Sequence, residues 1–246
     1  MLKNNLNIIT MKTNTSNSRR KFISSLTSGA VAATGLAFLP NALHAHTKVE
    51  KFGFGPEDLI TDNDNLDEMI KKIGKKSHPL AYDMSSVSPW GLIWSNVYYI
   101  TNEQTGTTPN QVGLLNVLRH HGMIYGLNDE TIKKYKLGEF LGLNDPKTNA
   151  PALKNPYYEP EDGVFPLPGL AGIKGLQEKG AQFCICDMAR KVYSQFVGQK
   201  HGVDQSVVYE DFVKGTLPGI KAAPSGVWAL GRLGENNISY IDASVG

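Results

Sequence analysis

One stretch of the chain organises the interpretation of the rest: Gly180-Ala181-Gln182-Phe183-Cys184-Ile185-Cys186-Asp187, which contains both cysteines of the 246 residues. A helical pattern ends at Gly180 and an apolar run of ordinary strand length follows it, so we predict a short buried strand here. A new helical pattern begins just after Cys186. In an open α/β fold, the end of a strand lies at the carboxyl edge of the sheet, where ligands and reactive side chains gather. We therefore expect any chemistry of this protein at Cys186.

Strand and helix patterns alternate along the chain on both sides of this stretch. This alternation predicts an α/β fold with a mostly parallel sheet and right-handed crossovers, in one domain covering residues 78–246. Residues 46–77 form a leader with a short helix, and the Pro-, Asn- and Asp-rich segment near 144–168 is a long insertion without regular structure. Insertions of this length usually have a function or move. Besides the opening stretch, strands are expected at 80–84, within 111–123, at 220–223 and at 238–241.

The first 45 residues have the pattern of a twin-arginine export signal. Ser18-Arg19-Arg20-Lys21-Phe22-Ile23-Ser24 pairs two arginines with Phe-Ile, a weakly apolar run of small residues follows, and the best cleavage site comes after Ala45. The alternative is a basic tail beside a membrane anchor, but the apolar run is shorter than the roughly 20 residues that a span needs. We expect export by the twin-arginine machinery to the periplasm or beyond, with no stable membrane anchor after cleavage.

The charge of the chain changes when this signal is removed. Residues 1–45 contain five basic residues and no acidic one, so the formal charge falls from +2 for the whole chain to −3 for the remainder. A nucleic-acid-binding protein needs a basic surface to neutralise phosphates. We therefore expect no nucleic acid among its partners.

The two cysteines differ in what their positions allow. Export places both in an oxidising compartment, but a bridge between residues two apart on one strand would close a small, strained ring. Cys184 fits equally well as a buried small apolar residue. Cys186 stands at a helix start, where backbone amides and Arg190 favour a thiolate and the carboxylate of Asp187 opposes it. Cys186 is thus the candidate reactive thiol and Cys184 a secondary one.

A second polar cluster, Arg119-His120-His121-Gly122, follows another predicted strand. His121 could lie across the sheet edge from Cys186 and act as a base or orient a ligand. Alternatively, His120 and His121 satisfy buried backbone groups, or the two histidines and Cys186 bind a metal. Because nothing in their spacing favours a metal specifically, we predict none.

Several short motifs resemble those of the DsrE/DsrF-like family. The run Gly180–Cys186 is similar to the family's strand that begins with glycine and ends with cysteine, and Val117-Leu118-Arg119-His120-His121-Gly122 resembles its second strand ending in His-Gly. The end of the chain resembles the family's closing pattern of turn, strand, helix and strand. The matching segments are Leu217-Pro218-Gly219-Ile220-Lys221, Pro224-Ser225-Gly226-Val227, and Gly234 before Tyr240-Ile241. The resemblance covers roughly residues 78–244 and rests on the order of these motifs.

The resemblance implies a three-layer α/β/α domain with flavodoxin-like topology, often a trimer or hexamer, and a cysteine that carries sulfur as a persulfide. Cys186 matches that cysteine, with His121, His120, Arg190 and Asp187 as candidate binding residues. The expected partners are a small sulfur species or a sulfur-carrier protein, and further copies of the chain. The export signal, the long insertion and Cys184 depart from the sulfur-relay members of the family.

We predict no cofactor. The chain has no glycine-rich phosphate loop after a strand, no Gly-x-Ser-x-Gly turn and no haem-attachment motif, although a flavodoxin-like topology could hold a flavin. The sequence-based hypothesis is an exported protein that binds or relays sulfur through Cys186, so any activity would be sulfur transfer rather than hydrolysis or cofactor-dependent redox chemistry. The alternatives are a non-enzymatic periplasmic binding or assembly module and, less favoured, a metal-binding protein using His120 and His121.

Overall fold

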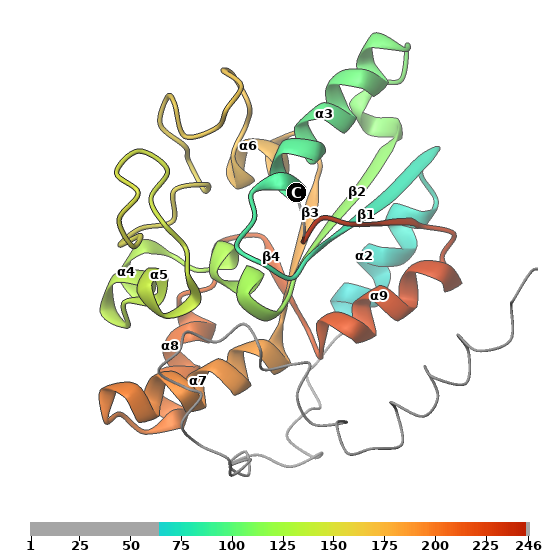
Figure 1. Ribbon diagram of the computed structural model, residues 1–246. Coiled ribbons are helices and arrows are strands. Elements are labelled where there is room, and N and C mark those ends of the chain that lie inside the picture. The colour runs from blue at the N-terminus through green and yellow to red at the C-terminus, as the bar shows by residue number, and fades with distance from the viewer. Residues whose placement is uncertain (1–63, 245–246) are drawn as a thin grey trace, which may run out of the picture. The chain divides into compact units, whose positions relative to one another are not determined.

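Five short parallel strands form the sheet at the centre of the computed structural model, which describes residues 64–244 (Figure 1). The strand order is β4-β3-β2-β1-β5, with all neighbours parallel. Each strand predicted from the sequence is present. Their bounds are β1 His78–Met84, β2 Val112–Leu118, β3 Gln182–Cys186, β4 Ile220–Ala223 and β5 Ser239–Asp242.

Helices cover both faces of this sheet and complete a three-layer α/β/α domain, as the sequence predicts (Figure 1). One face carries most of the helices, and α2 and α9 cover the other. The larger face holds α3 Trp90–Gln104, α6 Ile173–Glu178, α7 Asp187–His201 and α8 Gln205–Lys214, with the short η4 His120–Gly126, α4 Asp129–Lys134 and α5 Leu137–Leu141. The smaller face holds α2 Asp64–Gly74 and α9 Gly226–Glu235.

The burial of the strands follows from this layering. Every residue of β2, the central strand, is buried, whereas every residue of the edge strand β5 is exposed. A strand covered by helices on both faces has to be apolar at nearly every position, which explains the continuous apolar run seen in the sequence. Within β2, Leu114 and Leu118 face the larger helical layer, and Leu115 and Val117 face α2 and α9.

Helix α2 belongs to the domain rather than to a leader outside it. Leu66, Ile70 and Ile73 are almost completely buried against the sheet and α9. The predicted domain boundary at residue 78 therefore falls between α2 and the core to which α2 belongs. The apolar side of α2 is buried by packing on the sheet and α9. The predicted export signal and most of the predicted leader lie in residues 1–63, outside the described residues.

The strand order differs from the flavodoxin-like order expected from the resemblance. That order places β1 between β2 and β3. Here β1 lies between β2 and β5, because the chain runs stepwise from β1 to β4 and then returns through α9 to the far edge. The coarser class, a parallel sheet between two helical layers, is the one predicted.

The predicted insertion has no helix or longer strand between residues 144 and 168, apart from one isolated bridge between Asn144 and Pro151. It is nevertheless anchored to the domain. The buried side chain of Asn155 donates from Nδ2 to the carbonyl oxygens of Tyr125 and Leu127 at 2.9 and 3.0 Å. Among residues 64–244, no helix is both long and apolar enough to cross a bilayer.

Candidate functional site

The candidate site lies where β3 and β4 end, because their helices leave on opposite faces of the sheet. Helix α7 follows β3 onto the larger layer, and α9 follows β4 onto the smaller layer. Adjacent parallel strands whose connections diverge leave a crevice at their carboxyl ends, where ligands bind in open α/β folds. Cys186 ends β3 at this point and is paired in register with Ala223 at the end of β4.

Cys186 caps the first turn of α7 with its sulfur. Its Sγ accepts a hydrogen bond from the backbone N–H of Ala189 at 3.3 Å. The backbone N–H of Gly226, the first residue of α9, also hydrogen-bonds the thiol and favours its ionised form. Two helix N-termini therefore converge on one sulfur atom, and both stabilise negative charge there.

Burial acts against that charge. The Cys186 side chain is only 6% exposed, and this burial, the largest influence, raises the pKa of the thiol. The amides of Gly226 and Ala189 lower the pKa, Asp187 raises it, and Arg119 lowers it. Because the net shift is upward, the resting group is the neutral thiol at neutral pH, in a site whose fixed dipoles favour an anion.

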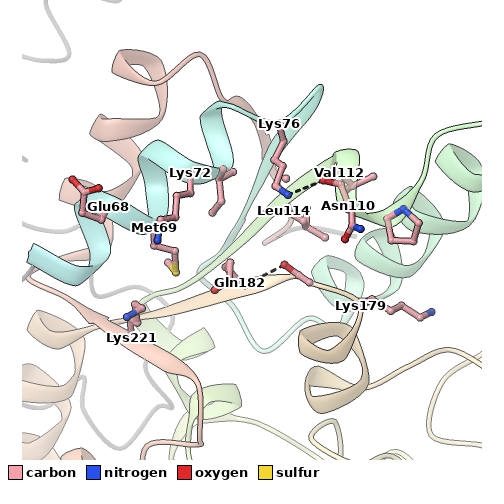
Figure 2. A pocket seen from close by; sticks show the side chains of 14 residues that line it. Glu68, Met69, Lys72, Lys76, Asn110, Val112, Leu114, Lys179, Gln182 and Lys221 are labelled. Carbon is pink, nitrogen blue, oxygen red and sulfur yellow. Dashed lines mark hydrogen bonds between the residues drawn. The ribbon is translucent and has the colours of Figure 1, made fainter.

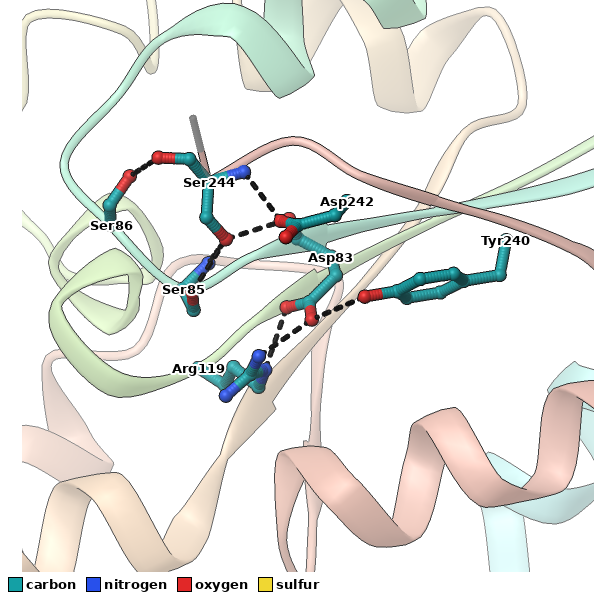
Figure 3. A network of polar contacts seen from close by, with 7 residues as sticks. All are labelled: Asp83, Ser85, Ser86, Arg119, Tyr240, Asp242 and Ser244. Atoms are coloured by element: carbon teal, nitrogen blue, oxygen red, sulfur yellow. Dashed lines mark hydrogen bonds and ion pairs between the residues drawn. The ribbon is translucent and has the colours of Figure 1, made fainter. Parts of the chain in front are cut away.

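Arg119 follows the last residue of β2 and is held by a buried carboxylate (Figure 3). Its Nε and Nη2 donate to the two carboxylate oxygens of Asp83, each at 2.7 Å, and the hydroxyl of Tyr240 donates to the same carboxylate at 3.0 Å. Asp83 is completely buried, and the Arg119 side chain is 30% exposed. A two-bond pair of this kind fixes the plane of the guanidinium as well as its position.

The start of α9 packs directly against Arg119. A Cβ atom added to Gly226 would lie 2.5 Å from Cβ of Arg119 and 2.8 Å from its Cδ. Only glycine allows this approach. The Gly226 amide and, more weakly, the positive charge of Arg119 lower the pKa of the Cys186 thiol. Arg119, Asp83 and Gly226 are not among the site residues predicted from the sequence. Two features could have suggested them: Arg119 directly follows a strand, and Gly226 follows the helix-capping Ser225.

The predicted histidines stack on each other beside the ring of Tyr193. The rings of His120 and His121 stack with centroids 4.4 Å apart, and each lies within 6 Å of the Tyr193 ring, at 5.8 and 5.6 Å. Burial raises the pKa of Tyr193, and the Cys186 thiol adds to this shift. His120 has a left-handed backbone with φ of 50°, which is uncommon outside glycine and marks strain beside the site.

His121 is electrically neutral in the folded protein. Burial, and to a lesser degree His120, lower its pKa to about 4. Within residues 64–244, no hydrogen bond joins His121 to Cys186. At neutral pH His121 can thus orient a ligand as a hydrogen-bond donor or acceptor, but it does not supply a positive charge to the thiol.

Arg190 and Asp187 pair with each other rather than with the thiol. Arg190 donates from Nε and Nη2 to Oδ1 of Asp187 at 3.0 and 2.6 Å, and Lys191 lies 3.0 Å from Oδ2. Tyr209 donates its hydroxyl proton to the same carboxylate at 2.9 Å. The positive charge expected from Arg190 is therefore matched by Asp187, and the cation nearest in effect to Cys186 is Arg119.

Cys184 belongs to the opposite part of the core. It is completely buried among the residues under α2 and α9, and burial raises the pKa of its thiol. Both cysteines are free thiols. Among the described residues, no three His, Cys, Asp or Glu side chains are grouped so that they could hold a metal ion. Comparisons of the chain with models of protein families, with curated proteins and with solved structures found no match.

Proposed function

We propose that this protein binds and relays sulfur through Cys186, which carries a sulfur atom as a persulfide. The observation that supports this most directly is that the N-termini of α7 and α9 each direct a backbone amide to the Cys186 thiol at the carboxyl edge of the sheet, with the positive charge of Arg119 as a weaker influence. These groups favour a negative charge at a position where the resting thiol is neutral. A bound persulfide anion would place its charge one bond farther from the buried Cys186 Sγ. The resemblance to DsrE-like proteins points in the same direction.

The proposed step is an exchange between a persulfide donor and Cys186. The Cys186 sulfur attacks the outer sulfur of the donor R–S–SH as the thiol proton leaves. A new S–S bond forms at Cys186, the S–S bond of the donor breaks, and the donor leaves as the thiol R–SH with the proton from Cys186. The products are Cys186–S–SH and R–SH, so no oxidant or reductant is needed.

The test is mass spectrometry of the full chain after incubation with a low-molecular-weight persulfide. We expect one additional sulfur atom, on the peptide that contains Cys186. Cys184→Ser should retain the adduct and Cys186→Ser should lose it. Arg119→Gln should lower the adduct's occupancy severalfold, because it removes the cation that favours the anion. If a thiol-alkylating reagent labels Cys186 in the folded protein but no persulfide forms there, the proposal is wrong.

A second function, a non-enzymatic binding or assembly module, is favoured by the burial of Cys186. A thiol that is 6% exposed and has a raised pKa fits a core residue equally well. In that case alkylating reagents should not label the native protein. Cys186→Ser should then leave its oligomeric state unchanged, as measured by light scattering.

We also propose that residues 1–45 direct twin-arginine export and that the exported protein forms a homo-oligomer. The first proposal rests on the Arg19-Arg20 pair and the following run of small residues. Replacing both arginines by lysine should keep the protein in the cytoplasm, as followed by cell fractionation. Export unaffected by that change would rule out the twin-arginine route.

A further inference from the structure

A cavity of about 360 Å³ lies at the amino edge of the sheet, the end opposite Cys186 (Figure 2). Its wall is formed by the beginnings of three strands, at Val112, Gln182 and Lys221, and by one side of α2. Ligands of open α/β folds usually bind at the carboxyl edge. This cavity is therefore separate from the candidate site. Its lining residues indicate what kind of ligand it could bind.

Four lysines from different parts of the chain line the cavity: Lys72 in α2, Lys76 just after α2, Lys179 before β3 and Lys221 in β4. The one acidic lining residue, Glu68, forms an ion pair with Lys71 at 3.0 Å. Within residues 64–244, the lysines that form no ion pair are Lys72, Lys75, Lys76, Lys133, Lys136, Lys179 and Lys221. Four of them line this cavity, and Glu68 is the one carboxylate among its lining residues, so positive charge predominates in the described part of the lining.

Lys76 differs from the other three because it serves the local structure. Its Nζ donates to the carbonyl oxygen of Asn110 at 2.7 Å and closes the wall of the cavity there (Figure 2). Lys72 and Lys221 lie toward the end of the cavity that α2 and β4 form, and Lys179 lies at the other end (Figure 2). Lys72 and Lys221 are thus the cations best placed to bind one charged group.

Part of the cavity lining is apolar. Met69 and Ile73 of α2 contribute apolar side chains to the lining, and each is more than nine-tenths buried. Pockets for small molecules typically combine an apolar surface with a few polar groups, and 360 Å³ is at the small end of their range. An inorganic anion would leave the apolar part uncovered, and a neutral apolar molecule would leave the lysines unused. We propose that this cavity binds an amphipathic organic anion, with its acidic group at Lys72 and Lys221 and its apolar body against Met69 and Ile73.

The experiment uses the full chain and the fluorescent sulfonate 8-anilinonaphthalene-1-sulfonate as the probe. We expect saturable binding of one probe molecule per chain. The double variant Lys72→Gln/Lys221→Gln should bind about fivefold more weakly or worse, because it removes both cations at the acidic group. The matched control is Lys75→Gln/Lys133→Gln, which removes the same charge from exposed lysines that do not line the cavity. Circular dichroism and thermal unfolding should be the same for all three proteins.

Competition separates the parts of the proposed ligand. Octanesulfonate should displace the probe, whereas octanol and inorganic sulfate at the same ionic strength should not. The proposal fails if the probe does not saturate, if the control variant weakens binding as much as the test variant, or if octanesulfonate does not compete. It also fails if sulfate competes as well as octanesulfonate, since that would indicate a site for charge alone. None of these results depends on Cys186.

Discussion

Arg119 owes its orientation to Asp83, whose carboxylate would otherwise be buried without a counter-charge. Replacing Asp83 by Asn keeps the shape of the side chain but leaves the guanidinium without its anionic partner. We expect Asp83→Asn to lower the free energy of unfolding by about 2 kcal/mol, less than for a fully buried pair because Arg119 is partly exposed. Urea unfolding measures this loss. Tyr240→Phe removes one neutral donor to the same carboxylate and should cost about 1 kcal/mol. Equal stability of Asp83→Asn and the unaltered protein would contradict the prediction.

His121 makes stability depend on pH. Its pKa is about 4 in the folded protein and close to 6.5 when unfolded, so the unfolded chain binds more protons between these values. The stability contributed by the neutral ring is complete above about pH 6.5 and declines as the pH falls toward 4. Between pH 7 and pH 5 the free energy of unfolding of the unaltered protein should therefore fall further than that of His121→Gln, by on the order of 1 kcal/mol. Urea unfolding at several pH values tests this, and parallel losses in both proteins would refute it.

The residues of the site were only partly predictable from the sequence. Cys186 was placed correctly at the end of a strand because the helix and strand patterns on either side of it are local. Arg119 was missed because its partner, Asp83, is 36 positions earlier in the chain and the two meet only when β1 and β2 pair. The pairing of Arg190 with Asp187 was also missed, although the two residues are only one helical turn apart. The charges of Arg190 and Asp187 were each considered for their effect on Cys186, but not for their attraction to each other.

The elements were more predictable than the site, with one instructive exception. The apolar spacing of residues 128–141 is typical of one helix, but the structure has two, α4 and α5, separated by Tyr135 and Lys136, and φ of Lys136 is 48°. The apolar spacing continues across this break, so periodicity alone does not reveal it. The strand order was likewise not determined by the order of the elements, since either edge of the sheet can accept the last strand.

Helix α9 offers a test of how an element's start positions the site. Gly→Ala within a helix usually stabilises a protein by up to about 1 kcal/mol. At Gly226 we expect the opposite, a loss of about 1–3 kcal/mol, because the new Cβ would overlap the Arg119 side chain. Gly231→Ala in the same helix is the matched control, since a Cβ there has no heavy atom within 4 Å and should stabilise. Thermal unfolding distinguishes them, and stabilisation by both changes would show that Arg119 moves aside freely.

At the scale of the whole molecule, the sheet needs cover on both faces, and the two covers are unequal. The larger layer is built from many elements that follow β1, β2 and β3 in the chain. The smaller layer consists of α2, which precedes the first strand, and α9, which precedes the last. Half of this layer therefore comes from a segment that the sequence analysis assigned to a leader. The spacing of apolar residues predicts helix α2 from the sequence. Whether α2 packs on the sheet depends on which face of the sheet the later helices leave uncovered.

This dependence predicts the effect of shortening the chain. A protein of residues 46–246 should unfold cooperatively in urea, whereas one of residues 78–246 should lose its cooperative transition. Without α2, the sheet residues Ala81, Leu115, Val117 and Cys184 keep only the cover that α9 provides, and Leu66, Met69, Ile70 and Ile73 no longer contribute. Burying side chains of this size contributes about 1.5–3 kcal/mol each, so their combined loss is comparable with the 5–15 kcal/mol that stabilises a typical domain. A chain of residues 61–246, which keeps α2, is the control and should behave like 46–246. If 78–246 unfolds with the same midpoint and steepness as 46–246, α2 is a dispensable leader and the smaller layer needs α9 alone.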